Sequence, residues 1–189
     1  SYIKKAGKVS DLSDKVSSKS IQGTCGIAHT RWATHGVPND TNAHPHLDKT
    51  GKIALVHNGI IENYDSIKKT LEGRGVVFKS ETDSEVISHI IEYELLRDNS
   101  PTNAFRRCLT KLIGTWGICA LFLEHDVMVC ARNGSPLIIG QGEGEMFVSS
   151  DPHAIANHTQ RVVFMDDGDL ATITKDSISM SNIKGEQLE

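Results

Sequence analysis

Helical periodicity in this sequence is confined to one central block, and that arrangement most constrains the fold. Residues 63–72, 82–97 and 100–112 repeat apolar residues every three or four positions, as amphipathic helices do. Short apolar runs that end at Gly, Asp or Asn, typical of strands, lie before and after this block. Helices in the middle with strands at both ends predict an α+β layered domain and not repeated βαβ units.

Two of the predicted helices carry start signals. Thr82 and Glu85 have the spacing of a capping box, in which each side chain accepts from a backbone N–H at the helix start. Ser100 followed by Pro101 predicts a capping hydroxyl and a proline at the first helical position. The strands are predicted at 24–28, 53–57, 116–123, 127–131, 136–140, 146–149, 162–165 and 170–174, with one short helix at 151–157.

Composition limits the partners and the compartment. With 189 residues and 38% hydrophobic content, the chain suffices for one domain with a core, which we place at residues 1–189. A net charge of −4 with mixed signs argues against nucleic acid or an anionic membrane as partner, and no apolar run approaches the roughly 20 residues that cross a bilayer. Four cysteines without a CxxC pair indicate reduced thiols in a cytoplasmic protein.

The unusual polar residues are concentrated in the first third of the chain. They form three segments, His29-Thr30-Arg31-Trp32-Ala33-Thr34-His35-Gly36, Asn42-Ala43-His44-Pro45-His46 and Val56-His57-Asn58-Gly59-Ile60-Ile61-Glu62-Asn63. Three interpretations compete for these segments.

The first interpretation is a metal site. Five histidines fall in a short span, but no carboxylate stands at a ligand spacing and no HExxH or CxxC partner is present. We therefore expect neither a metal nor a cofactor; the histidines concerned are His29, His35, His44, His46 and His57.

The second interpretation is purely structural. Arg31 alone would be an ordinary ion-pair residue. Asn58-Gly59 after an apolar strand is a common turn signal, and Asp83 in a first helical turn stabilises the helix without any ligand.

The third interpretation joins the same residues into an amino-acid pocket. An arginine fork such as Arg31 holds an α-carboxylate through two parallel hydrogen bonds, and a carboxylate such as Asp83 neutralises an α-ammonium. The Asn58 amide and the Gly59 N–H together suit a developing oxyanion. These parts fit a free amino acid whose side-chain amide is cleaved, and they leave glutamine and asparagine open.

The motifs in order resemble a known family. Arg31 to Gly36 (RWATHG), Asn42 to His46 (NAHPH), His57 to Asn63 (HNGIIEN) and Ser80 to Asp83 (SETD) look like the glutaminase domain of the glutamine–fructose-6-phosphate aminotransferases, or glucosamine-6-phosphate synthases. Further landmarks match in the same order, so that the resemblance covers essentially the whole chain: Gly7-Lys8-Val9, Arg132-Asn133-Gly134-Ser135-Pro136-Leu137 and Ser149-Ser150-Asp151.

The resemblance implies an N-terminal-nucleophile hydrolase fold, a four-layer αββα sandwich, in which an N-terminal cysteine attacks glutamine and its own α-amine is the base. An α-amine titrates at roughly 7.7–8, which suits that role. By resemblance, the remaining site roles fall on Arg31, Thr34 and His35 for the glutamine carboxylate end, Trp32 for the pocket wall, Asp83 for the α-amino group, and Asn58 with Gly59 for the oxyanion hole.

The nucleophile of the family pattern has no counterpart in this sequence. That pattern opens with Cys-Gly-Ile well ahead of the Gly7-Lys8-Val9 landmark, so we expect the nucleophile and the first strands to lie upstream of Ser1. Cys25-Gly26-Ile27 copies the opening letters, but Cys25 has no free α-amine, and we interpret it as a small apolar residue in a core strand.

The resemblance also implies partners. The complete synthase needs two sugar-isomerase domains that bind fructose-6-phosphate and receive ammonia; nothing here resembles them, and we expect a homo-oligomer formed through them. Two alternatives remain open: a non-catalytic glutamine-binding relative, and the glutaminase domain of another amidotransferase such as amidophosphoribosyltransferase. A metal-dependent hydrolase is a third.

Overall fold

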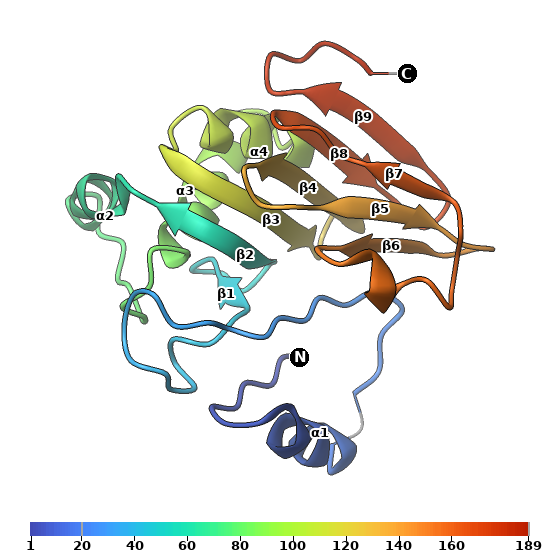
Figure 1. The fold of residues 1–189 in the computed structure, drawn as a ribbon. Helices are drawn as coiled ribbons and strands as arrows, with labels where there is room; N and C mark the ends of the chain where they lie inside the picture. Colours follow the sequence, from blue (N-terminus) through green and yellow to red (C-terminus); the bar gives the residue numbers. More distant parts are fainter. Residues whose placement is uncertain (20, 189) are drawn as a thin grey trace.

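The computed structural model describes residues 1–19 and 21–188. Four α-helices, one 3₁₀ turn and nine strands are found within these residues (Figure 1). The helices are α1 Val9–Ser17, α2 Tyr64–Glu72, α3 Glu85–Leu95 and α4 Pro101–Leu109, and the 3₁₀ turn is η1 Pro152–Ala154. The strands are β1 His46–Leu47, β2 Ile53–Ile61, β3 Gly114–Phe122, β4 Val127–Asn133, β5 Ile138–Gln141, β6 Met146–Ser149, β7 Val162–Phe164, β8 Asp169–Ile173 and β9 Ile178–Asn182.

The strands make two antiparallel sheets. The larger sheet has the order β1-β2-β3-β4-β8-β9, and the smaller has the order β6-β5-β7. The longest ladder joins β2 to β3, from Ile53 opposite Phe122 to Ile61 opposite Gly114. Because side chains alternate across a strand, this register sends His57 toward one face and Asn58 toward the other.

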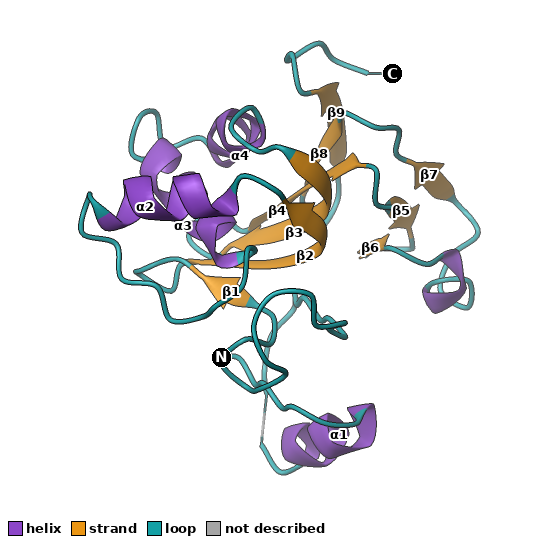
Figure 2. Ribbon diagram, turned by 60° about the vertical axis from the view of Figure 1, so that its left-hand side comes forward, coloured by secondary structure: helices purple, strands orange, loops and turns teal. Residues whose placement is uncertain are grey.

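Helices α2, α3 and α4 cover one face of the larger sheet, and the smaller sheet lies beyond its other face (Figure 2). The main core lies between helices and sheet, where Phe105 and Ile87 meet Leu55, Ile118 and Phe122. A second core lies between the sheets; its members include Cys119, Cys130, Leu137, Ile139 and Ile173. The order of layers is therefore helices, larger sheet and smaller sheet. These are three of the four layers in the predicted αββα sandwich.

The prediction for the start of α4 is confirmed, whereas the capping box predicted at the start of α3 is wrong. The Ser100 hydroxyl accepts a hydrogen bond from Asn103 N at 3.3 Å, with Pro101 at the first helical position. Helix α3 begins only at Glu85, whose carboxylate accepts from Ser80 N at 2.6 Å instead of closing a box with Thr82. A tertiary contact explains the difference, because the Thr82 hydroxyl is turned toward the His46 ring at 3.1 Å.

Two further predictions of elements are corrected. The expected strand at 24–28 is an irregular segment without a ladder partner among the described residues, and Cys25 is exposed there, not in a core. Only Ile27 of this segment packs against the second core. The expected helix at 151–157 is a single 3₁₀ turn. The other predicted strands are confirmed within a few residues, whereas α1, β1 and β9 were not predicted.

The N-terminal segment lies below the larger sheet in Figure 1, with α1 away from the body. Helix α1 has no buried residue. Among the described residues, none of the helices combines the length and apolar character that a bilayer crossing requires.

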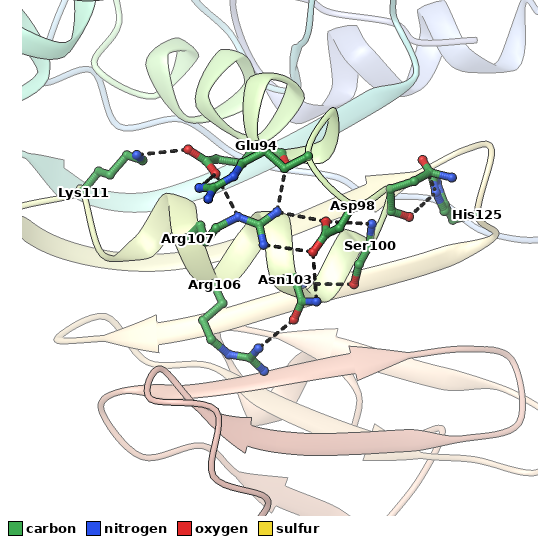
Figure 3. Close-up of polar contacts among 10 residues, drawn as sticks. Glu94, Asp98, Ser100, Asn103, Arg106, Arg107, Lys111 and His125 are labelled. Carbon is green, nitrogen blue, oxygen red and sulfur yellow. Dashed lines mark hydrogen bonds and ion pairs between the residues drawn. The ribbon is translucent and has the colours of Figure 1, made fainter.

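An ion cluster joins α3 to α4 (Figure 3). The Glu94 side chain is 1% exposed and lies 2.8 Å from Arg107 Nε and 3.0 Å from both Arg97 Nη1 and Lys111 Nζ. Arg107 also pairs with Asp98 at 2.9 Å. Burial favours the neutral acid, but the hydrogen bonds from these cations outweigh it and lower the pKa of Glu94.

Candidate functional site

Three segments distant in sequence meet near the end of β2: the loop 31–37, residues 58–61 of the strand, and residues 80–85 before and at the start of α3. The buried Asp83 carboxylate accepts from the backbone N–H of Ile61 at 2.8 Å, which holds the third segment against the second. Hydrogen bonds of the Asn42 amide attach the loop to the segment before α3.

Arg31 closes the turn of its own loop. Its Nη2 donates to the carbonyl oxygens of His35 and Gly36, and its Nη1 donates to that of Val37 at 3.3 Å. A guanidinium has five N–H donors, so two remain, one on Nε and one on Nη1, and these two point apart and do not form a fork. Arg31 is therefore not the free fork that the sequence predicted, although it retains donors for a carboxylate.

Asn42 fastens the loop to the segment before α3. Its buried amide donates to Val37 O and to Glu81 Oε2, both at 3.0 Å, and accepts from Glu81 N at 3.0 Å. Gly36, with φ of +75°, fits closely here, since an added Cβ would lie 2.7 Å from the Asn42 amide nitrogen. Asn42 belongs to the NAHPH motif but has no predicted role; its signal in the sequence is an amide in a short, glycine-containing loop.

His35 and Asp83 are brought together. His35 Nδ1 lies 3.9 Å from Asp83 Oδ1 and 3.4 Å from the Thr34 hydroxyl, and its ring packs edge-on against Tyr64 at 5.0 Å. Trp32, by contrast, is 90% exposed.

Asn58 and Gly59 stand side by side near the end of β2. Asn58 Oδ1 accepts from His29 Nε2 at 2.8 Å. Gly59 has φ of +126°, and an added Cβ would overlap the carbonyl oxygen of Thr115 on β3. The strand pairing alone therefore requires glycine at this position, in addition to the predicted approach of a reacting group.

On the opposite face of β2, His57 points into the helical side. Its Nδ1 lies 2.9 Å from the hydroxyl of Ser84, just before α3. Burial lowers the pKa of His57, and the nearby Asp83 carboxylate opposes this only in part. A neutral His57 thus links β2 to the start of α3 beside Asp83.

No metal arrangement is found: within residues 1–19 and 21–188, no three His, Cys, Asp or Glu side chains are disposed as ligands. The cysteines are not activated either. Burial raises the pKa of Cys130 to about 12 and also raises that of Cys108 and Cys119, and partial burial raises the pKa of the exposed Cys25. Low-pKa thiols occur beside cations or at helix N-termini instead.

The arrangement suits a small zwitterion. The Arg31 guanidinium keeps two open donors, and the Asp83 carboxylate is buried. The segments that carry these two groups are joined by His35 and Asn42, so the site presents opposite charges from connected segments. Asn58 and Gly59 stand three and two residues before Ile61, whose N–H holds Asp83.

Comparison with known proteins assigns the fold and family. The family model described as glutamine amidotransferase domain matches residues 29–157, which include every predicted site residue. The chain belongs to the glutamine amidotransferase domain family.

Two relatives, both glutamine–fructose-6-phosphate aminotransferases (isomerizing), come from Pyrococcus horikoshii and Aliivibrio fischeri. The first is 50% identical over 184 residues, which are 96% of this chain and 31% of the relative; the second is 46% identical over 188 residues, 99% and 30%. This amidotransferase domain therefore spans about a third of the length of those relatives.

Solved structures agree with the family at the level of fold. A structure described as the allosteric regulatory enzyme of purine biosynthesis has a TM-score of 0.70 with 24% identity, covering 82% of this chain and 34% of that one. The glutamine phosphoribosylpyrophosphate amidotransferase from B. subtilis has a TM-score of 0.66 with the same identity and coverage. The predicted fold class of the amidotransferase domain is confirmed.

Proposed function

We propose that this chain is the glutamine-hydrolysing part of a glutamine–fructose-6-phosphate aminotransferase. Glutamine is cleaved to glutamate and ammonia, and the ammonia aminates fructose-6-phosphate to glucosamine-6-phosphate in hexosamine biosynthesis. The observation that carries the proposal is the junction of the Arg31 loop, Asp83 and Asn58-Gly59 in one frame. The identity of about half with two aminotransferases over nearly the whole chain supports the same assignment.

Each residue has a role in this proposal. One open donor of Arg31 binds the α-carboxylate of glutamine, with Thr34 and His35 beside it, and Asp83 binds the α-ammonium. Trp32 closes over the pocket from its exposed position. The thiolate that family resemblance assigns to an N-terminal cysteine attacks the carboxamide carbon, and Asn58 and Gly59 donate to the resulting oxyanion.

The whole protein contains further domains and forms an oligomer in this proposal. Sugar-isomerase domains of the same polypeptide receive the ammonia, the enzyme is a homo-oligomer through them, and it works in the cytoplasm without a metal or cofactor. Residues 1–189 belong to one glutaminase domain.

The test is glutamate release by the natural full-length protein. Arg31→Lys and Asp83→Asn should raise KM for glutamine at least ~10-fold, because each removes a charge-assisted contact to the substrate. Asn58→Ala should lower kcat by about 10²–10³, the range for loss of one oxyanion donor. The exposed acid Asp176 offers a control, since Asp176→Asn should leave both constants unchanged.

Two outcomes would redirect the assignment. Glutamine binding without hydrolysis by the full-length protein would favour a non-catalytic relative. Ammonia transfer to phosphoribosylpyrophosphate but not to fructose-6-phosphate would favour an amidophosphoribosyltransferase, the activity that one structural neighbour is named for.

A further inference from the structure

Three imidazole rings, those of His29, His44 and His46, pack in a row that begins at the Asn58 side chain. The His29 and His44 rings are 4.0 Å apart between centroids, and the His44 and His46 rings are 4.7 Å apart. His29 contacts Asn58 at one end of the row, and His46 contacts the Thr82 hydroxyl, next to Asp83, at the other. The row, defined here as His29, His44 and His46, therefore connects the two arms of the candidate site.

The contact at the Asn58 end fixes the orientation of the amide. Asn58 Oδ1 can only accept, so the His29 Nε2 at 2.8 Å carries the hydrogen and donates it. The amide group is planar with its oxygen and nitrogen on opposite sides. Occupation of Oδ1 by His29 therefore turns the Asn58 NH₂ group away from the row. Within residues 1–19 and 21–188 that NH₂ group donates to no other atom.

The packing of the row keeps His29 a neutral donor. Burial lowers the pKa of His29 and also that of His44 and His46, so the three rings stack uncharged at neutral pH. His29 itself is half-buried, and one side of its ring packs against His44, which is 9% exposed. A second rigid anchor comes from the strand, since Asn58 lies opposite Gly117 in the β2–β3 ladder.

We propose that His29 is a positioning residue for the glutaminase reaction: it holds the Asn58 carboxamide so that its NH₂ faces the oxyanion. The proposal rests on the function proposed above for Asn58. It gives His29 a role without contact to substrate, and it replaces the metal-ligand interpretation that the sequence left open for this histidine.

The experiment measures kcat and KM for glutamate release by the natural full-length enzyme and its variants. His29→Ala should lower kcat about 10- to 100-fold, less than Asn58→Ala, because the amide remains but is free to turn. KM for glutamine should change less than about 2-fold, since His29 does not contact the substrate. His29→Gln should recover most of the loss, because its amide N–H can take the place of Nε2–H.

A double-variant cycle separates positioning from general damage. If His29 acts through Asn58, the His29→Ala change should have no further effect on kcat when Asn58→Ala is already present. His153→Ala is the matched control, because that histidine is 92% exposed at its side chain and lies outside the row. Independent, multiplying losses in the double variant would overturn the proposal, as would an unchanged kcat in His29→Ala.

A folding defect in the alanine variant does not block the test. His29→Gln and His29→Leu are then compared, because both fill similar space and only glutamine offers an N–H. Activity in the glutamine variant with loss in the leucine variant supports positioning, and equal activities refute it. Absence of glutaminase activity in the unmutated full-length protein would instead remove the function proposed for the site, so the two failures are distinguishable.

Discussion

Replacement of Glu94 by glutamine tests whether the ion cluster between α3 and α4 stabilises the helical layer (Figure 3). The Glu94 side chain is 1% exposed and contacts three cations at 2.8–3.0 Å. Glu94→Gln removes the charge at nearly constant volume, so that lost electrostatics and not a cavity governs the result.

The expected magnitude follows from the exposure of each partner. Arg107, 26% exposed, is the best shielded of the three cations, and a hydrogen bond to a charged group contributes about 1.5–3 kcal/mol. Arg97 and Lys111 are 61% and 48% exposed, so water screens them and each adds well under ~1 kcal/mol. The variant also escapes the desolvation cost of a buried carboxylate. We therefore expect a net loss of about 2–3 kcal/mol.

Hydrogen exchange of α3 and α4 amides in the natural full-length protein measures this loss locally. A loss of that size should speed exchange in both helices roughly 30- to 140-fold, at a factor of ten for each ~1.4 kcal/mol. Glu124→Gln is the control, because its 2.6 Å pair with Lys52 is more than half exposed on both sides and should leave exchange unchanged. An acceleration below about 3-fold in Glu94→Gln would show that desolvation cancels the pairing and would refute the reasoning.

Three further variants test other parts of the fold. Gly59→Ala should destabilise by about 2–4 kcal/mol in thermal unfolding, because alanine must adopt φ of +126° and its Cβ overlaps the Thr115 carbonyl oxygen; an unchanged Tm would contradict this. Ser100→Ala should cost about 1 kcal/mol through loss of the bond to Asn103 N, visible as faster exchange at the start of α4 and absent in Ser100→Asn. Burial lowers the pKa of His46 to about 3, whereas an unfolded histidine titrates near 6.5. The unfolded state therefore binds more protons between these values, and the free energy of unfolding should fall as pH drops through this window. His46→Gln should therefore make the difference between the Tm values at pH 7.5 and pH 5.5 smaller than it is in the unmutated protein.

Sequence reasoning succeeded where a signal is local. Ser100 and Pro101 start α4 through contacts within one turn, and the strand at 53–57 is found inside the longer β2. It failed where a distant residue competes for the same group. Thr82 has the spacing of a cap, but the ring of His46, 36 residues earlier, takes its hydroxyl, while Glu85 turns back to the N–H groups of Lys79 and Ser80.

Strands show the same division. The segment 24–28 has the apolar pattern of a strand, yet a strand requires a ladder partner, and that partner is a property of the whole fold. Strand β9 was missed for the reverse reason. Its residues 178–182 do alternate, but the pattern contains only two apolar residues, Ile178 and Met180, which is too short to stand out, and pairing with β8 supplies what the pattern lacks.

The candidate site shows how a motif can be located correctly while its mechanics stay hidden. The motif placed Arg31 and Asp83 in one pocket, and the structure brings their segments together. Three of the Arg31 donors, however, are consumed by carbonyl oxygens of its own loop, which no spacing rule reveals. Gly59 illustrates the converse, since its glycine is demanded by Thr115 on the next strand whether or not an oxyanion is bound. A substitution at Gly59 therefore reports on folding first. Asn58, whose amide is free of any such backbone constraint, is the position at which loss of kcat at an unchanged Tm would separate oxyanion stabilisation from stability of the β2–β3 ladder.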